Sequence, residues 1–406
     1  MLILKNLAER LFFPGFGFFV FVLFIGVTYC IIPFFLFMFF SVDEFFIKLS
    51  GLTFFSIIIL IVGYFTPLID GQFSEGARRI VISSSFFNSV VWAFFLVFAA
   101  YTFYTAQSIP LYSALLGASA DALSQERGDF FKGRTGAESM LLYLSTIFTT
   151  VLIPYSLVLM YRDNNRYRHF LFLMSFAFCV SFLQKALFLN IFLPVLVCFA
   201  ITGRLSLRMF LGCLFGIPLI LVAAVFLSLG DASTALVSEG VKLDYYFSSK
   251  YLPVGGMDYL FWRIFAVPLF TATDTLLVHS EIFKGEFLMG ATSTLLSLIS
   301  GMDRINIERY VFQHQFGSWN EIANANAVFV SDAYVNFGWV GIFCFSFLIG
   351  QVFRWFRLSS DIAFKSLWPV FALTLYSASL IGMLMSNGFL YILFHALFLR
   401  IYCAPR

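Results

Sequence analysis

Charge is scarce in this chain, and its scarcity excludes most classes of soluble protein. Charged residues make up 12% of the 406 residues, against about 25% in soluble domains. Hydrophobic residues make up 61%, and the mean hydropathy is +0.91. Uncharged runs of about 20 residues, the length that crosses a bilayer, recur from Leu11 to Arg400. We therefore expect an all-α polytopic membrane protein.

Common cofactor and catalytic motifs are also missing from the sequence. The six cysteines lie in or beside apolar runs and show neither a disulfide framework nor zinc-ligand spacing. The sequence has no glycine-rich nucleotide loop, no Asp-x-Asp pair, no Gly-x-Ser-x-Gly and no His-Glu-x-x-His. Any group transfer would therefore rely on side-chain cations and a base, without a cofactor.

Hydropathy predicts about ten spans. They lie near residues 16–40, 51–69, 86–105, 139–161, 169–184, 187–202, 209–229, 337–356, 367–385 and 389–403. Two apolar stretches allow a different count. Phe170–Ile201 would be about 48 Å long as one helix, against a hydrocarbon core of about 30 Å; in the alternative hairpin, Lys185 marks the turn. Ser366–Leu399 offers the same choice, with a turn at Ser386-Asn387-Gly388.

The distribution of charge favours both hairpins, because Lys and Arg collect in cytoplasmic loops. With ten spans, one face receives 14 of the 25 basic residues and only 5 of the 22 acidic ones. We predict that this face is cytoplasmic and carries both termini. The chain is then a single membrane domain, 1–406, with two sizeable periplasmic loops. One loop is 106–138; the larger, 230–335, is inserted between the seventh and eighth spans.

The large loop is the most charged part of the chain. Between Asp231 and Val335 it holds eleven acidic and six basic side chains. It contains two amphipathic segments, Met257–Val267, which Pro268 interrupts, and Thr294–Phe312. Amphipathic helices commonly lie in the plane of the membrane interface. We expect them to cover the spans and to form a surface for binding or catalysis.

Loop 106–138 and the first hairpin contain candidate anion-binding residues, since guanidinium groups make bidentate hydrogen bonds to phosphate. Arg127, Lys132 and Arg134 lie within eight residues; the alternative is that they pair with neighbouring acids. Lys185 would lie inside the membrane, where ionisable groups face a cavity or a partner. Its alternative is a shallow turn from which the ammonium reaches water.

The large loop has its own candidates. Arg263 lies among aromatic residues and could contact phosphate or sugar, or pair with Asp258 or Asp274. Arg304, Arg309 and His314 follow within eleven residues. Glu308 stands four residues after Arg304, which is also the spacing of a local helix pair. Histidine suits proton abstraction near neutral pH, although a histidine without a partner is more often structural.

One segment resembles a known family. Asn326-Ala-Val-Phe-Val-Ser-Asp332-Ala-Tyr334-Val-Asn336-Phe-Gly338-Trp-Val-Gly341, followed by Phe347-Leu-Ile-Gly350, is similar to the late signature of the Wzy-type O-antigen and oligosaccharide repeat-unit polymerases. The expected layout agrees, with about ten spans and one large loop before the signature.

The resemblance implies a glycosyltransferase on the periplasmic face of a bacterial inner membrane. It would join oligosaccharide repeats carried on undecaprenyl pyrophosphate, without a metal. The implied roles are a pyrophosphate clamp, a base, and residues that position sugar or loop. These fall on Arg127, Lys185, Arg263 and Arg304 or Arg309 for the clamp, His314 or Asp332 for the base, and Tyr334 and Asn336 for positioning. The implied partners are the lipid-linked glycan, the bilayer and a chain-length regulator, with no nucleic acid.

There are four other interpretations. A ligase that moves finished glycan from the same carrier to lipid A core would share the large loop and the cations. Another transferase class uses an acidic pair in its first outer loop, which Asp43-Glu44 would match, although that loop is only about ten residues long. A flippase or other transporter would show internal repeats and charged helices near the midplane, and a purely structural membrane protein would not need these cations.

Overall fold

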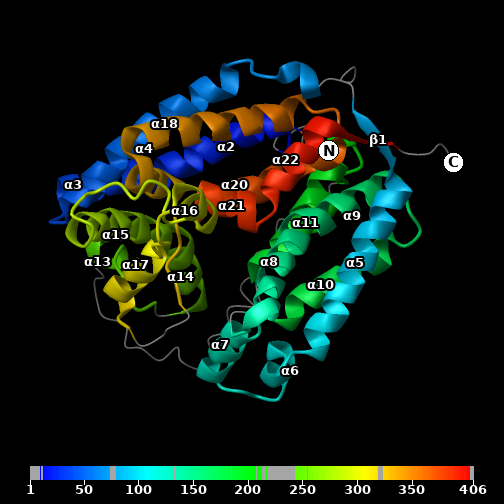
Figure 1. Ribbon diagram of the computed structural model, residues 1–406, viewed down its shortest axis with the longest axis horizontal. Helices are drawn as coiled ribbons and strands as arrows, with labels where there is room; N and C mark the ends of the chain where they lie inside the picture. Colours follow the sequence, from blue (N-terminus) through cyan, green and yellow to red (C-terminus); the bar gives the residue numbers. More distant parts are fainter. Residues whose placement is uncertain are drawn as a thin grey trace.

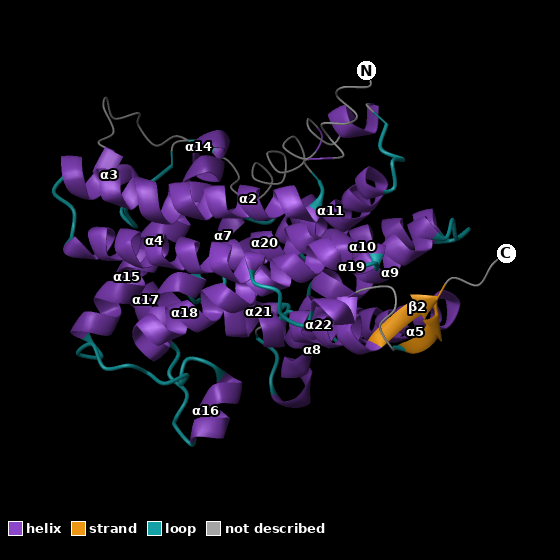
Figure 2. Ribbon diagram, turned by 90° about the horizontal axis from the view of Figure 1, so that it is seen from above, coloured by secondary structure: helices purple, strands orange, loops and turns teal. Residues whose placement is uncertain are grey.

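The computed structural model describes residues 10, 12–73, 79–131, 133–183, 185–206, 208–212, 216, 243–253, 255–318 and 323–402. In this part of the chain, six helices are long and apolar enough to cross a membrane. They are Pro14–Phe39, Glu44–Phe65, Ser84–Tyr104, Gly136–Arg162, Gly256–Glu281 and Phe329–Leu358. A seventh span results if the bent pair Leu380–Ser386 and Phe389–Phe398 is counted as one. Figures 1 and 2 show the helical architecture expected of an all-α polytopic membrane protein.

The individual elements follow in chain order. The first half contains α2 (Pro14–Ile25), η1 (Gly26–Ile31), α3 (Ile32–Phe39), α4 (Glu44–Phe65), η2 (Asp70–Phe73), β1 (Ile80–Ser83), α5 (Ser84–Tyr104), α6 (Pro110–Leu115), α7 (Ala120–Asp129), η3 (Gly136–Ser139), α8 (Met140–Ile147), η4 (Phe148–Leu152), α9 (Ile153–Arg162), α10 (Arg168–Ser181) and α11 (Lys185–Ile201). The second half contains α13 (Leu243–Tyr246), α14 (Gly256–Phe261), η5 (Trp262–Ala266), α15 (Val267–Glu281), α16 (Thr294–Ser300), α17 (Ile307–Phe316), α18 (Phe329–Leu358), α19 (Ile362–Ser366), α20 (Trp368–Tyr376), α21 (Leu380–Ser386), α22 (Phe389–Phe398) and β2 (Leu399–Tyr402).

The two ambiguous apolar stretches are resolved differently. The first is two packed helices, α10 and α11, which meet near Lys185 as the hairpin prediction required. The second is broken at Ser377–Ser379 and again at Gly388, where φ is +81°. Helices α21 and α22 meet at 70°, so the predicted hairpin of two full spans is wrong there.

The described structure also differs from the ten predicted spans in other ways. The predicted span at 209–229 lies mostly outside the described residues. Helix α4 begins at Glu44, so most of the predicted outer loop before residue 51 forms its first two turns, about 3.6 residues each. Within the predicted large loop, Gly256–Glu281 forms one helix of 26 residues that by length and composition could cross a membrane. The prediction of a single loop over 230–335 did not include a helix of this length.

Pro268 does not interrupt this helix, contrary to the prediction, because a wider turn precedes it. A proline lacks the amide N–H and its ring clashes with the carbonyl of residue i−4 in an α-helix. At the end of η5 the N–H of Val267 bonds instead to the carbonyl of Trp262, five residues back. The same i−5 bond precedes Pro33 after η1 and Pro154 after η4. Each π-turn thus lets the helix continue through its proline.

The second predicted amphipathic segment, Thr294–Phe312, is also divided. Helix α16 ends at Gly301, whose φ of +67° is a left-handed conformation that suits glycine. Helix α17 begins after Asn306, whose side-chain oxygen accepts a hydrogen bond from Arg309 N at 3.1 Å. An asparagine in this position satisfies one of the free N–H groups of a helix start.

Helices α4 and α18 pack closely against each other, and small residues make this possible. A Cβ on Gly63 would lie 2.4 Å from Phe347 O, and one on Gly350 would lie 2.3 Å from Leu60 O. Ser56 and Ser346 share a buried hydrogen bond of 2.7 Å. Packing of this kind holds helices together where lipid removes the hydrophobic driving force. Figure 1 shows the two helices running side by side.

The end of the bundle formed by the last turns of α9 and α18 and by the strands β1 and β2 is rich in arginine, and we call it the basic end. There Arg354 binds Asp70, with Nη2–Oδ2 at 2.5 Å, and Arg162 binds Asp163 at 2.8 Å. Strands β1 and β2 pair in parallel there, from Ile80↔Leu399 to Ser83↔Tyr402. This short pairing was not predicted. It ties the segment before α5 to the end of α22.

Substitution of Gly350 by alanine should destabilise the fold, because its methyl group would collide with a backbone oxygen of α4. We expect overpacking of about 1–3 kcal/mol and a lower melting temperature of the purified protein in detergent. Gly51→Ala is the matched control, since Gly51 is also helical and a Cβ there meets nothing within 4 Å. The close-packing explanation would be wrong if both variants melted at the same temperature.

Candidate functional site

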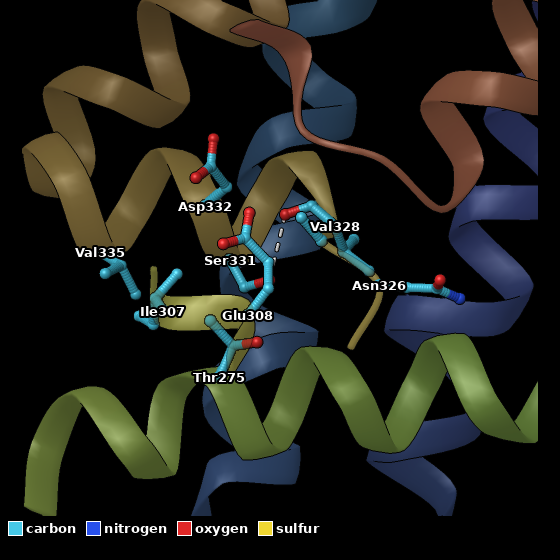
Figure 3. Close-up of a pocket in the computed structure, with 9 residues that line it drawn as sticks. Thr275, Ile307, Glu308, Asn326, Val328, Ser331, Asp332 and Val335 are labelled. Carbon is cyan, nitrogen blue, oxygen red and sulfur yellow. Dashed lines mark hydrogen bonds between the residues drawn. The ribbon is translucent and has the colours of Figure 1, made fainter. Parts of the chain in front are cut away.

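A small pocket lies where α15, α17 and the beginning of α18 meet (Figure 3). Its volume of about 10 Å³ is near the minimum that holds one water. Two acidic residues, Glu308 of α17 and Asp332 of α18, belong to its wall. The complete lining is Thr275, Ile307, Glu308, Asn326, Ala327, Val328, Ser331, Asp332 and Val335.

Asp332 is 5% exposed and belongs to a buried polar network. Its Oδ1 accepts a hydrogen bond from Asn336 Nδ2 at 3.0 Å and lies 3.3 Å from the Thr292 hydroxyl. Asn336 is fully buried, and its Oδ1 accepts a hydrogen bond from Gly290 N at 3.0 Å. The network therefore fixes one carboxylate oxygen of Asp332 and fastens the segment 290–292 to α18.

The sequence around Asn336 explains how α18 presents this carboxylate. Gly338 interrupts the helix with φ +62° and ψ −144°, and a Cβ there would lie 2.7 Å from the ring of Phe287. At Gly341 a Cβ would lie 2.3 Å from Ala333 O. The chain bends so sharply that Gly341 touches the backbone of Ala333, eight residues earlier. The first segment of α18, Phe329–Phe337, is thereby turned away from the long helix that packs on α4.

Glu308 approaches Asp332 from the first turn of α17. It is partly buried, and its burial raises the pKa of the carboxyl above the ordinary value, although the nearby Arg304 opposes the shift. Ala325 N donates to the Glu308 backbone oxygen at 3.0 Å, which holds the segment before α18 against α17. Glu308 and Asp332 lie close enough to interact electrostatically. Figure 3 shows the two side chains entering from different helices.

Either of the two carboxylates that line this small pocket can accept a proton. An ionised carboxylate offers only acceptor oxygens, so a hydroxyl or water placed there would donate its hydrogen to one of them. Like charges held together also favour the protonated form of one partner. The pocket admits one hydroxyl-sized group, and the rest of a large substrate would remain outside it.

The predicted site residues in and just before α17 lie in different surroundings. Arg304, in the loop before the helix, is exposed four residues before Glu308. Arg309 is partly buried and its Nη1 donates to Ala323 O at 3.4 Å. His314 is exposed at the other end of the helix and interacts electrostatically with Asp274 of α15. His314 is not part of the pocket wall, so the structure brings Asp332 together with Glu308 and not with His314.

Tyr334 lies on a different face of α18 from Asp332. Its ring packs against the rings of His279, Phe287 and Trp339, with centroids 5.9–6.4 Å apart. The ammonium of Lys48 lies 4.7 Å from the centroid of the Tyr334 ring. Tyr334 therefore belongs to an aromatic cluster beside the pocket.

The remaining predicted cations lie on other elements. Arg263 is exposed on η5, twelve residues and about 18 Å of helix before Thr275. Arg127 on α7 donates from Nε to Leu123 O at 3.2 Å. Figures 1 and 2 both place α7 apart from α17, so this structure does not assemble the full predicted clamp.

Arg134 and its neighbours support the local-pairing alternative for loop 106–138. Arg134 bonds Glu138 at 3.2 Å, Phe130 O at 2.7 Å and Thr102 O at 3.0 Å, which ties the loop to α5. Lys132 lies outside the described residues. Lys185 begins α11, and its side chain also lies outside what the structure describes.

Sequence reasoning missed three contributors. Glu308 was interpreted as a helix partner of Arg304, although its side chain lines the pocket. Thr292 and Lys48 carried no signal, because their roles depend on contacts with residues 44 and 286 positions away in the sequence. Among the described residues, no group of three or more His, Cys, Asp or Glu side chains could hold a metal ion.

The comparisons with known proteins identify no relative. No family model, no curated protein and no solved structure matches this chain.

The stability of the protein should depend on the charge of Glu308. Its raised pKa means that the folded state holds the proton more tightly than the unfolded chain. The stabilisation is therefore complete below the ordinary glutamate pKa, about 4.3, and is lost as the pH rises through the folded value. We expect the melting temperature of Glu308→Gln, relative to wild type, to rise between pH 4 and pH 8. The exposed Glu286→Gln should follow wild type; a Glu308→Gln difference independent of pH would contradict the assignment.

Proposed function

We propose that this chain is a glycosyltransferase that joins oligosaccharide repeats carried on undecaprenyl pyrophosphate, on the periplasmic face of a bacterial inner membrane. The observation that supports it most is the Glu308–Asp332 pocket, in a multi-pass membrane protein, beside the exposed guanidinium of Arg304. Its signature segment, Asn326–Gly341, supplies Asp332 and the bend that presents it.

The reaction needs a proton acceptor and a stabilised leaving group. The acceptor hydroxyl oxygen forms a bond to the anomeric carbon, while the bond from that carbon to the pyrophosphate oxygen breaks. The electron pair leaves with the undecaprenyl pyrophosphate, and the hydroxyl proton passes to Glu308 or Asp332. A general base contributes about 10²–10⁴ in rate, and preorganised cations stabilise the developing negative charge.

The positions of the cations favour a smaller clamp than the family resemblance implies. Arg304 and Arg309 flank Glu308 in sequence, whereas Arg263 and Arg127 lie on separate elements. We therefore assign the leaving pyrophosphate to Arg304 and Arg309. Asn336 holds the segment 290–292 in place through Gly290 and Thr292.

The orientation follows from the charge distribution. The basic end faces the cytoplasm in this proposal, as positively charged loops do, and the pocket faces the periplasm. The helix Gly256–Glu281 then lies in the outer interface over the ends of the other helices. Asp258, Arg263, Asp274, His279 and Glu281 all occur along it, which suits an interfacial helix better than a lipid-facing span. Figure 3 shows α15 running crosswise to α4.

Loss of the Asp332 carboxylate should abolish polymerisation. Purified protein supplied with lipid-linked repeats should make a ladder of longer glycans, and Asp332→Asn should slow it by at least about 100-fold. Arg166→Ala, which removes an exposed cation near the basic end, should match wild type. The carboxylate assignment would fail if Asp332→Asn and Glu308→Gln both polymerised at the wild-type rate.

Two further arms of the same assay test the reaction class. The ladder should form in EDTA, because side-chain cations carry the leaving charge; loss in EDTA with recovery in magnesium would show that a metal carries it. With lipid A core as the added acceptor, no glycan should be transferred to the core. Transfer to the core without a ladder would identify a ligase.

Removal of Arg304 should reduce kcat more than it raises KM. Its guanidinium is exposed one turn from Glu308, where it can meet the charge that develops on the leaving pyrophosphate. We expect Arg304→Ala to lower kcat by about 10²–10³, with Arg304→Lys retaining part of the rate. An unchanged kcat in Arg304→Ala would remove this residue from the clamp.

A further inference from the structure

Lys48 has the environment of an anion-binding residue, although it lies outside the pocket. It stands on the second turn of α4, partly buried, with its ammonium 4.7 Å from the Tyr334 ring centroid and 5.8 Å from that of Phe45. Glu44 is one turn earlier, at the spacing of a helix ion pair. Among the described residues, Lys48 nevertheless makes no ion pair.

The surface of α4 is bare three residues after Lys48. Gly51 is exposed, and a Cβ there would meet nothing within 4 Å. We call this bare position the gap at Gly51.

An apolar surface continues from this gap along α4 and α18. Phe55 packs edge-on against Trp339 with ring centroids 5.4 Å apart, and Trp339 is 53% exposed. Ile58 and Val62 of α4 and Phe343 of α18 are also exposed. Tyrosine and tryptophan prefer the membrane interface, where one side of the ring is wet and the other apolar. Lys48, Tyr334 and Trp339 thus mark a boundary between charge and hydrocarbon.

Lys48 is also close to the catalytic pocket. Thr275 lines the pocket and His279, one turn later on α15, contacts Tyr334 and interacts electrostatically with Lys48. The pocket and the Lys48 site therefore flank neighbouring turns of one helix. A ligand whose charged head lay at Lys48 would have its tail in the bilayer and its distal part near Glu308 and Asp332.

We propose that Lys48, with Tyr334 and the gap at Gly51, binds the diphosphate of a polyprenyl carrier, whose isoprenoid chain lies along the exposed surface of α4 and α18. This proposal rests on the proposed function, because it names the site that holds the carrier of the acceptor repeat, whereas Arg304 and Arg309 hold the pyrophosphate that leaves the donor. The charge of Lys48 supplies the attraction to phosphate, and the aromatic rings position the ammonium at the membrane boundary.

The test measures binding and not transfer. The full chain in phosphatidylcholine nanodiscs is titrated with undecaprenyl diphosphate that carries no sugar. Lys48→Met should weaken binding at least about tenfold, the usual consequence of losing a charged hydrogen bond, and Lys48→Arg should restore most of it. Gly51→Leu should also weaken binding by filling the gap. Lys365→Met is the matched control, since Lys365 lies 5.9 Å from the Phe13 ring near the basic end.

Competing lipids identify the part of the ligand that is recognised. Undecaprenol should not displace the diphosphate, and phosphatidylglycerol should do so only in large excess. Wild-type affinity in Lys48→Met, or mole-for-mole displacement by phosphatidylglycerol, would overturn the proposal. If wild type bound the carrier through Lys48 but made no glycan, the proposed function would fail while this site stood. If wild type made glycan and Lys48→Met bound normally, only this site would fail.

Discussion

The close contact of α4 with α18 is the constraint on which the rest of the structure depends. Backbones meet at Gly63 and Gly350, where no side chain could fit, and Gln351 Nε2 donates to the carbonyl oxygens of Gly63 at 2.6 Å and Thr66 at 2.7 Å. In lipid, such direct packing and hydrogen bonding replace the hydrophobic effect that holds soluble helices together. At the basic end, Arg354 of α18 forms an ion pair with Asp70, which follows α4 in the sequence. The opposite end of α18 is thereby given a fixed starting point.

From that fixed point, two glycines convert a membrane helix into a platform for a site. Gly338 takes the left-handed conformation that ends the straight part of α18, and Gly341 lets the bent segment lie against the helix it came from. Asp332 and Asn336 therefore stand on a short helix whose direction the backbone determines. Segment 290–292 is attached to this helix by buried hydrogen bonds, so the carboxylate is held by a rigid element and not by a loop.

Sequence reasoning predicted what depends on local composition. It predicted a polytopic helical protein and the break near Lys185. It failed where the outcome depends on distant contacts. A proline normally ends a helix, and nothing in the sequence showed that a π-turn would carry the helix through Pro268. An i, i+4 pair explained Glu308 adequately until Asp332 was placed beside it by the bend at Gly338. Lys48 carried no signal in the sequence, because its partner, Tyr334, is 286 residues away.

Cations that the protein itself binds differ from those that it leaves exposed, and this difference bears on function. At the basic end, Arg354 and Arg162 form ion pairs, and Arg204 donates to the backbone oxygen of Tyr161 at 3.4 Å. These three cations are already bound to the protein itself. At the other end, Arg304 is exposed and Lys48 rests on aromatic rings, and neither forms an ion pair among the described residues. If the fold needed these charges only for its own stability, we would expect them to pair with acidic residues. Each has one four positions away in the sequence, Glu308 for Arg304 and Glu44 for Lys48. The structure turns Glu308 into the pocket and leaves Lys48 on aromatic rings, which is the arrangement expected of cations that bind an anionic ligand.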